Sequence, residues 1–195
     1  GRALDVVGAE GGGVRRHPRR DVAIVARPLA LGGLEARLVT LYDPYYAALG
    51  DLLGELCAAA GHAVLVDGHT GSPRRMKDHQ AIIGTRHDAT CAPELATAVA
   101  AIFTRHGFEV HRNISGYIGG NIVATYGRPE ARRVHALQLE VNASLLMTTS
   151  REEFIARVSR GDTPEKAEAN IARVRACLRE VLAVLPETLA RVCGD

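Results

Sequence analysis

The chain has 195 residues, with 24 Lys and Arg against 22 Asp and Glu, and its formal net charge is +2. This balance gives no electrostatic reason to expect nucleic acid or an anionic membrane as a partner. Hydrophobic residues make up 47% of the chain, which excludes a wholly disordered protein. No stretch approaches the ~20 apolar residues that a membrane helix needs.

The N-terminal half is predicted to hold three strands and one helix. Short apolar or β-branched runs indicate the strands. An Asp-Pro pair indicates the start of the helix, because Asp is a good N-cap and Pro suits the first helical position. The predicted elements are strands at 22–26, 37–41 and 62–66 and a helix from Asp43 to Gly61. A polar loop over residues 67–73 is expected to follow the third strand.

The C-terminal half continues the alternation of strands and helices. The predicted elements are strands at 81–84, 108–111 and 134–142, a helix over 93–107 and a long helix from Thr163 to Pro186. A glycine-rich loop with room for a short helix is expected over residues 113–127. This order favours a three-layer α/β/α sandwich with a mostly parallel or mixed central sheet.

Asp67 and His69 follow an apolar strand that is expected to be central and parallel to the strand over 134–142. Ligands of open α/β sheets bind at the carboxyl ends of strands, and neither side chain belongs in a core without a partner. His69 could bind zinc through one ring nitrogen, and Asp67 could support a ligand by a hydrogen bond. The alternative is a hydrogen-bonded loop histidine.

A carboxylate lies in the middle of the strand predicted over 134–142. The two-residue period places Leu137, Leu139 and Val141 on one face and Gln138, Glu140 and Asn142 on the other. Strands covered on both faces are nearly all apolar, so Glu140 requires an explanation. It is either a general base that faces a metal-bound water or a side chain on the wet face of an edge strand.

Other polar residues carry weaker signals. Arg74, Arg75, Arg86 and Arg128 could clamp a substrate carboxylate, because guanidinium groups bind carboxylates in a bidentate manner. The pair His87-Asp88 and the run Lys77-Asp78-His79 are interpreted as surface. The four cysteines form no C-x-x-C pair and are expected to be reduced and mostly buried. Motifs for a serine nucleophile and for dinucleotide binding are absent.

The segment Asp67-Gly68-His69-Thr70, directly after an apolar strand, resembles the D-x-H-S/T motif of the N-formylglutamate amidohydrolase family. Further segments resemble motifs of that family in the same order. These are residues 40–46, 83–86, 90–94, 107–113, 119–120, 126–129 and 135–142. The resemblance covers about residues 38–147, and the order and spacing of the motifs make it fairly specific.

The resemblance implies a zinc-carboxypeptidase-like hydrolase that removes a formyl or other acyl group from an acidic amino acid such as N-formylglutamate. It implies that His69 binds zinc and that Glu140 activates water and later protonates the leaving amine, with Asp67 and Gln138 in supporting positions. Arg74, Arg86 and Arg128 are the expected substrate-binding residues. The expected partner is the small-molecule substrate, and the expected setting is amino-acid degradation in the cytoplasm.

The chain departs from the family pattern toward its N-terminus. It has no Pro-His-x-Gly segment, where the family's first zinc ligands lie, and residues 2–8 lack the family's Asn-Arg pair. Tyr46 replaces a motif histidine. Because zinc takes three or four protein ligands, His69 alone cannot hold it. We therefore expect a single domain over residues 1–195 that lacks the family's N-terminal part; the alternative is a non-catalytic relative that binds a small ligand or a partner.

Overall fold

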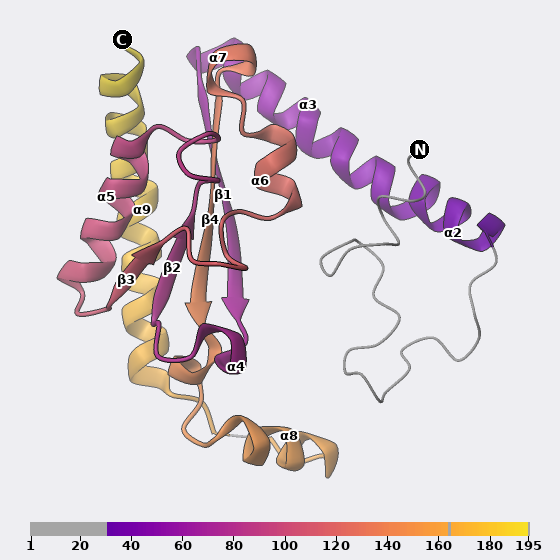
Figure 1. Ribbon diagram of the computed structural model, residues 1–195, viewed down its shortest axis with the longest axis vertical. Coiled ribbons are helices and arrows are strands. Elements are labelled where there is room, and N and C mark those ends of the chain that lie inside the picture. Colours follow the sequence, from indigo (N-terminus) through magenta and orange to yellow (C-terminus); the bar gives the residue numbers. More distant parts are fainter. Residues whose placement is uncertain (1–30, 164, 195) are drawn as a thin grey trace. The chain divides into compact units, whose positions relative to one another are not determined.

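The computed structural model of the chain describes residues 31–163 and 165–194 (Figure 1). The chain divides into two compact units, one that ends at Glu55 and one that begins at Leu56. The strand predicted over 22–26 and the segment 2–8 lie outside the described residues. The expectation of a single domain stays a prediction.

The described part of the first unit is helical. Helix α2 (Leu31–Arg37) continues through a π-helical turn, η1 (Leu38–Tyr42), into α3 (Asp43–Ala60), which crosses into the second unit. The prediction of a strand over 37–41 was therefore wrong. Val39 is 64% and Leu41 is 70% exposed, so this apolar run buries no face, and helical hydrogen bonding satisfies its backbone locally. Asp43 has helical backbone angles and is not an N-cap, whereas the predicted end before Gly61 is confirmed.

The second unit contains one mixed sheet of four strands. They are β1 (Ala63–Gly71), β2 (Ala81–Gly84), β3 (Val110–Arg112) and β4 (Val134–Asn142), in the order β1-β4-β2-β3. β1 runs parallel to β4, whereas β2 is antiparallel to β4 and parallel to β3. This arrangement confirms the predicted α/β class with a mixed sheet.

β1 differs from its prediction in length and in position. It pairs with β4 over its whole length, up to Gly71 beside Asn142, so the polar residues after Val66 extend the strand and do not form a loop. Among the described strands β1 lies at one edge and β4 is internal, so the expectation of a central β1 was wrong for this part of the chain. The predicted parallel pairing of the two strands is confirmed.

Helices cover both faces of the sheet. The helical elements that follow β1 in the chain are α4 (Pro73–Met76), α5 (Pro93–Arg105), α6 (Asn121–Tyr126), α7 (Pro129–Arg132), the 3-10 turn η2 (Ala143–Leu146), α8 (Arg151–Ser159) and α9 (Glu168–Cys193). α5 and α9 pack together against one face, where Leu137, Leu139 and Val141 of β4 join their apolar side chains in the main core. α6 lies on the other face, against β4 and β1 (Figure 1).

The C-terminal helix α9 begins later and ends later than predicted. It starts at Glu168 and continues through Pro186 to Cys193. Leu185 and Thr188, on either side of the proline, are both 5% exposed, so burial of this helical face offsets the lost hydrogen bond. α8 was not predicted. Among the described helices, none combines the length and the apolar character required to cross a membrane.

Candidate functional site

The pairing of β1 with β4 brings the four central polar residues of the site together. Asp67 lies beside Gln138 and His69 beside Glu140 in the parallel register. Paired residues of neighbouring strands point to the same face, and residues two apart on one strand share that face. All four side chains therefore belong to one face of the sheet, opposite the apolar core of α5 and α9.

Each strand contributes an internal polar contact to this group. Nε2 of His69 lies 2.9 Å from Oδ1 of Asp67 on β1. On β4, Nε2 of Gln138 donates a hydrogen bond of 2.9 Å to Oε1 of Glu140. The His69 side chain is 47% exposed and the Asp67 side chain 11%, whereas Glu140 as a residue is 6% exposed. The site therefore has an accessible imidazole beside a buried carboxylate.

The environment of Glu140 favours the protonated form of its carboxyl group. Burial raises its pKa above the ordinary value, because a charged carboxylate loses solvation in the protein interior. The imidazole of His69 opposes this effect, and the negative charge of Asp67 adds to it. A carboxylate with a raised pKa is a stronger base than one in water, which suits general-base chemistry near neutral pH.

The position of β4 excludes one of the two explanations for Glu140. All nine residues of the strand are buried, and β4 lies between β1 and β2, so it is not an edge strand with a wet face. The predicted alternation of faces is confirmed by the core contacts of Leu137, Leu139 and Val141. Asn142 has a structural task, because its side-chain amide donates to the carbonyl oxygens of Lys77 and His79.

The segment over residues 117–120, before α6, passes over the site and is called the covering loop below. It was not predicted to contribute to the site. A Cβ atom on Gly120 would lie 3.5 Å from Nε2 of Gln138 and 3.8 Å from Oδ2 of Asp67. Tyr117 forms a hydrogen bond with the backbone of Ser72. Burial raises the pKa of its phenol, and the nearby Glu140 carboxylate raises it further. Tyr117 and Gly120 are thus additional residues of the site, indicated in the sequence only by the glycine-rich loop.

The arginines predicted to bind substrate lie at different distances from Glu140. Arg86 reaches the covering loop, where its guanidinium donates to the carbonyl of Gly119. Arg74 is exposed on α4, the short helix that follows β1. The Arg128 backbone bonds to Val134 at the other end of β4, six residues or about 20 Å of strand from Glu140. The structure therefore does not bring the backbone of Arg128 to the site.

The described residues near His69 do not complete a metal site. His69 is the only histidine of the four-residue group, and its Nε2 atom contacts Asp67. One cluster of three metal-ligating side chains occurs in the described part of the chain, formed by His79, Glu109 and His111, and it does not include His69. Zinc needs three or four protein ligands, so these residues fit at most part of its coordination at His69.

Comparison with known proteins bears directly on this geometry. Residues 2–147, three quarters of the chain, match the family model described as N-formylglutamate amidohydrolase. The chain belongs to the N-formylglutamate amidohydrolase family. Both strands of the candidate site and the covering loop fall inside the matched region.

Individual relatives support this membership of the N-formylglutamate amidohydrolase family. An N-formylglutamate deformylase of Pseudomonas aeruginosa is 31% identical over 177 residues, which cover 84% of this chain and 63% of the relative. A second N-formylglutamate deformylase, from Pseudomonas putida, is 30% identical over 128 residues, covering 61% of this chain and 47% of the relative. The chain thus spans between about half and two thirds of the length of these relatives.

A solved structure of the same family has the same fold. The crystal structure of N-formylglutamate amidohydrolase from Ralstonia eutropha JMP134 superimposes with a TM-score of 0.68 at 25% sequence identity. The superposition covers 88% of this chain and 60% of the other. The α/β sheet and helices described above are therefore the fold of this amidohydrolase family.

Proposed function

We propose that the chain carries the catalytic carboxylate of a zinc-dependent amidohydrolase that acts on an N-acyl acidic amino acid such as N-formylglutamate. The observation that carries this proposal is the position of Glu140. It is a buried carboxylate with a raised pKa, on an internal strand, beside the accessible imidazole of His69. Membership of the family and the deformylase activity for which the relatives are named support the amide class of substrate.

Glu140 has the chemistry that amide hydrolysis requires. As a carboxylate it takes a proton from the attacking water, and as an acid it returns that proton to the departing amine. The hydrogen bond from Gln138 fixes one carboxylate oxygen, so the other oxygen, Oε2, is the one that can accept the proton. Asp67 holds the ring of His69 in orientation through Nε2.

The substrate proposed here, an N-acyl acidic amino acid, carries two carboxylates, so cationic groups are needed around Glu140. Arg86 donates a hydrogen bond to the carbonyl of Gly119 in the covering loop, and Arg74 lies on the helix that follows the Gly71 end of β1. The backbone of Arg128, in contrast, is bonded at the opposite end of β4 from Glu140. We therefore assign the carboxylate contacts to the first two.

Zinc at this site is part of the proposal, with His69 as one ligand. The described residues around His69 do not supply a full set, so the remaining ligands would come from elsewhere in the protein. His69→Ala is expected to abolish zinc binding at this site in a protein with complete ligands. Zinc retained there after His69→Ala would exclude the ligand role.

Formate release from N-formyl-L-glutamate tests the role of Glu140. Glu140→Gln keeps the shape of the side chain but cannot accept the proton, so turnover is expected to fall about 10²- to 10⁴-fold while substrate still binds. The matched control is Glu130→Gln, which alters an exposed carboxylate on α7 and should leave turnover unchanged. Near-normal turnover in Glu140→Gln would refute the general-base role.

A second function, binding without catalysis, is favoured by the partial ligand set that residues 31–163 and 165–194 offer at His69. A non-catalytic relative would bind the substrate or a similar small ligand and release no formate. Isothermal titration of the wild-type chain with N-formyl-L-glutamate, in parallel with the formate assay, separates the two functions. Binding with no turnover in the presence of added Zn²⁺ would establish the second function and exclude the first for this chain.

A further inference from the structure

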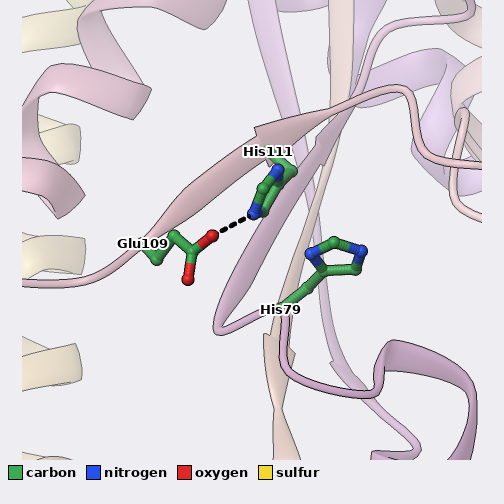
Figure 2. Close-up of side chains that lie close together, drawn as sticks. All are labelled: His79, Glu109 and His111. Atoms are coloured by element: carbon green, nitrogen blue, oxygen red, sulfur yellow. Dashed lines mark hydrogen bonds and ion pairs between the residues drawn. The ribbon is translucent and has the colours of Figure 1, made fainter.

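Three metal-ligating side chains meet beside β3, away from Glu140. His79 precedes β2, and Glu109 and His111 lie on either side of Val110 (Figure 2). One ligand atom from each of the three lies within 4.8 Å of the others. Nε2 of His111 is 2.6 Å from Oε1 of Glu109, and the rings of His79 and His111 are 4.1 Å apart between centroids. The sequence analysis had interpreted His79 as surface.

Hydrogen bonds hold the backbone under each of these side chains. The carbonyl of His79 accepts from Asn142, and its N–H donates to Met76. Glu109 donates its N–H to the Gln80 side chain and accepts from Ala81. His111 lies within β3, paired with Ile82. The three groups are therefore presented by fixed backbone, so only side-chain rotations are needed to bring them to one ion.

The distances allow such a rotation. Zinc bonds of about 2.1 Å in tetrahedral geometry place ligand atoms about 3.4 Å apart. The cluster must contract by at most about 1.4 Å from its 4.8 Å spread, and the Glu109–His111 contact must open by about 0.8 Å from 2.6 Å. The ion would replace the hydrogen that Glu109 and His111 share. With the Glu109 side chain 61% and the His111 side chain 30% exposed, an ion can enter from solvent.

The donor types select the metal. Two imidazoles and one carboxylate suit Zn²⁺ and related transition-metal ions, whereas Mg²⁺ and Ca²⁺ prefer oxygen ligands alone. The carboxylate also places a negative charge beside the two imidazoles, which favours binding of a divalent cation more than two histidines alone would. A set of two histidines and one glutamate leaves one position of a tetrahedral zinc site that these three residues do not fill.

This cluster is separate from the site at Glu140, although both lie on the same face of the sheet. Ile82 pairs with Glu140 on one side and with His111 on the other, and its side chain is fully buried. Two strand spacings, about 10 Å, therefore separate the backbones of the two sites. The ions of two-metal catalytic centres lie about 3.5–4 Å apart and share ligands, and Glu140 is not among the ligand atoms of this cluster.

We propose that His79, Glu109 and His111 form a binding site for Zn²⁺ that is independent of His69 and fastens the segment before β2 to β3. The experiment measures Zn²⁺ affinity of the 195-residue chain by equilibrium dialysis, with the unfolding midpoint as a second readout. One ion is expected to bind in wild type and in His69→Ala. His79→Asn and His111→Asn should each weaken affinity at least tenfold and remove the rise in unfolding midpoint that Zn²⁺ produces.

The control is His87→Asn, which removes an exposed histidine outside the cluster at a position whose left-handed backbone suits Asn. It should keep wild-type affinity. Glu109→Gln, at a strongly exposed side chain, provides a test that does not depend on how well the histidine variants fold, and it should also weaken binding. Wild-type affinity in both His111→Asn and Glu109→Gln would overturn the proposal. Loss of all Zn²⁺ binding in His69→Ala would overturn it too, and would assign the ion to the proposed catalytic site.

Discussion

Replacement of Gly84 by alanine should displace the loop that covers the candidate site. Gly84 lies in β2 beside Gln138 of β4, and a Cβ atom there would lie 2.5 Å from the backbone nitrogen of Gly119. It would also lie 2.7 Å from the carbonyl carbon of Ile118 and 2.8 Å from the carbonyl oxygen of Tyr117. All three contacts are with backbone, so no side-chain rotation can relieve them.

The size of the effect follows from these distances. Ordinary Cβ contacts begin at 3.4 Å, so the loop must retreat by about 0.9 Å from Gly84. Overpacking of this kind costs typically about 1–3 kcal/mol in the free energy of unfolding. For a chain of this length the midpoint of thermal unfolding should fall by about 2–12 °C. Tyr117 and Gly120 move with the loop, so binding at Glu140 should weaken as well.

Urea denaturation of Gly84→Ala measures the change in the free energy of unfolding. The matched control is Gly68→Ala in β1, where an added Cβ meets no atom within 4 Å. The control should unfold within about 0.5 kcal/mol of wild type. If Gly84→Ala is as stable as Gly68→Ala, the covering loop is not held against β2 as the structure places it, and the inferred role of the loop fails.

Three further predictions concern the core. Phe103 is fully buried, so Phe103→Ala should lower the free energy of unfolding by about 3–5 kcal/mol in urea titrations. A loss below about 1 kcal/mol would show that Phe103 is not packed in the core. Burial lowers the pKa of His135, whose Nδ1 accepts a hydrogen bond from Ala92. As pH falls, the imidazole therefore binds a proton at a higher pH in the unfolded chain than in the folded chain. The free energy of unfolding should decrease as pH drops below about 6.5. His135→Gln should flatten this decrease relative to wild type, and an unchanged pH profile would disprove the assignment. Burial raises the pKa of Cys91 to about 12, so iodoacetamide at pH 8 should modify this thiol only after unfolding, as mass spectrometry of the labelled peptides would show. Equal labelling of native and denatured protein would contradict its burial.

The sequence predicted the sheet of the second unit well because its strands carry strong local patterns. The strand over 134–142 was correct to the residue, since its alternation places apolar side chains against α5 and α9. The run over 37–41 has equally good strand formers and is helical, because strand formation needs a partner that the local pattern cannot specify. The helix was also predicted to end at Pro186, but burial of one face of α9 outweighs the unfavourable effect of proline within a helix.

The candidate site was predictable to the extent that it lies on adjacent strands. Asp67, His69, Gln138 and Glu140 could be selected because polar residues in apolar strands are unusual, and the structure brings them together. The contribution of Tyr117 could not be predicted, because it depends on how a loop folds back over the sheet. The His79 cluster was missed because His79 lies about 30 residues before Glu109 and His111 in the sequence, and the three meet only through the pairing of β2 with β3.

The proline within α9 has a consequence for the motions of the helix. Pro186 has no N–H to donate to the carbonyl of Leu182, and both residues lie on the exposed side of the helix, where water can take the vacant position. The hydrogen-bonded ladder is therefore weakest at this point. We expect the amides after Pro186 to exchange with deuterium faster than those between Val174 and Leu185, as a separate cooperative unit.

Local unfolding of that unit would expose one buried side chain, that of His135, to water. Sγ of Cys193 lies 3.9 Å from Nε2 of His135, whose ring is buried at the start of β4. When the last two turns of α9 separate, this imidazole meets water while the sheet remains paired. We therefore expect the C-terminal end of α9 to control the access of water to His135, at the end of β4 farthest from Glu140.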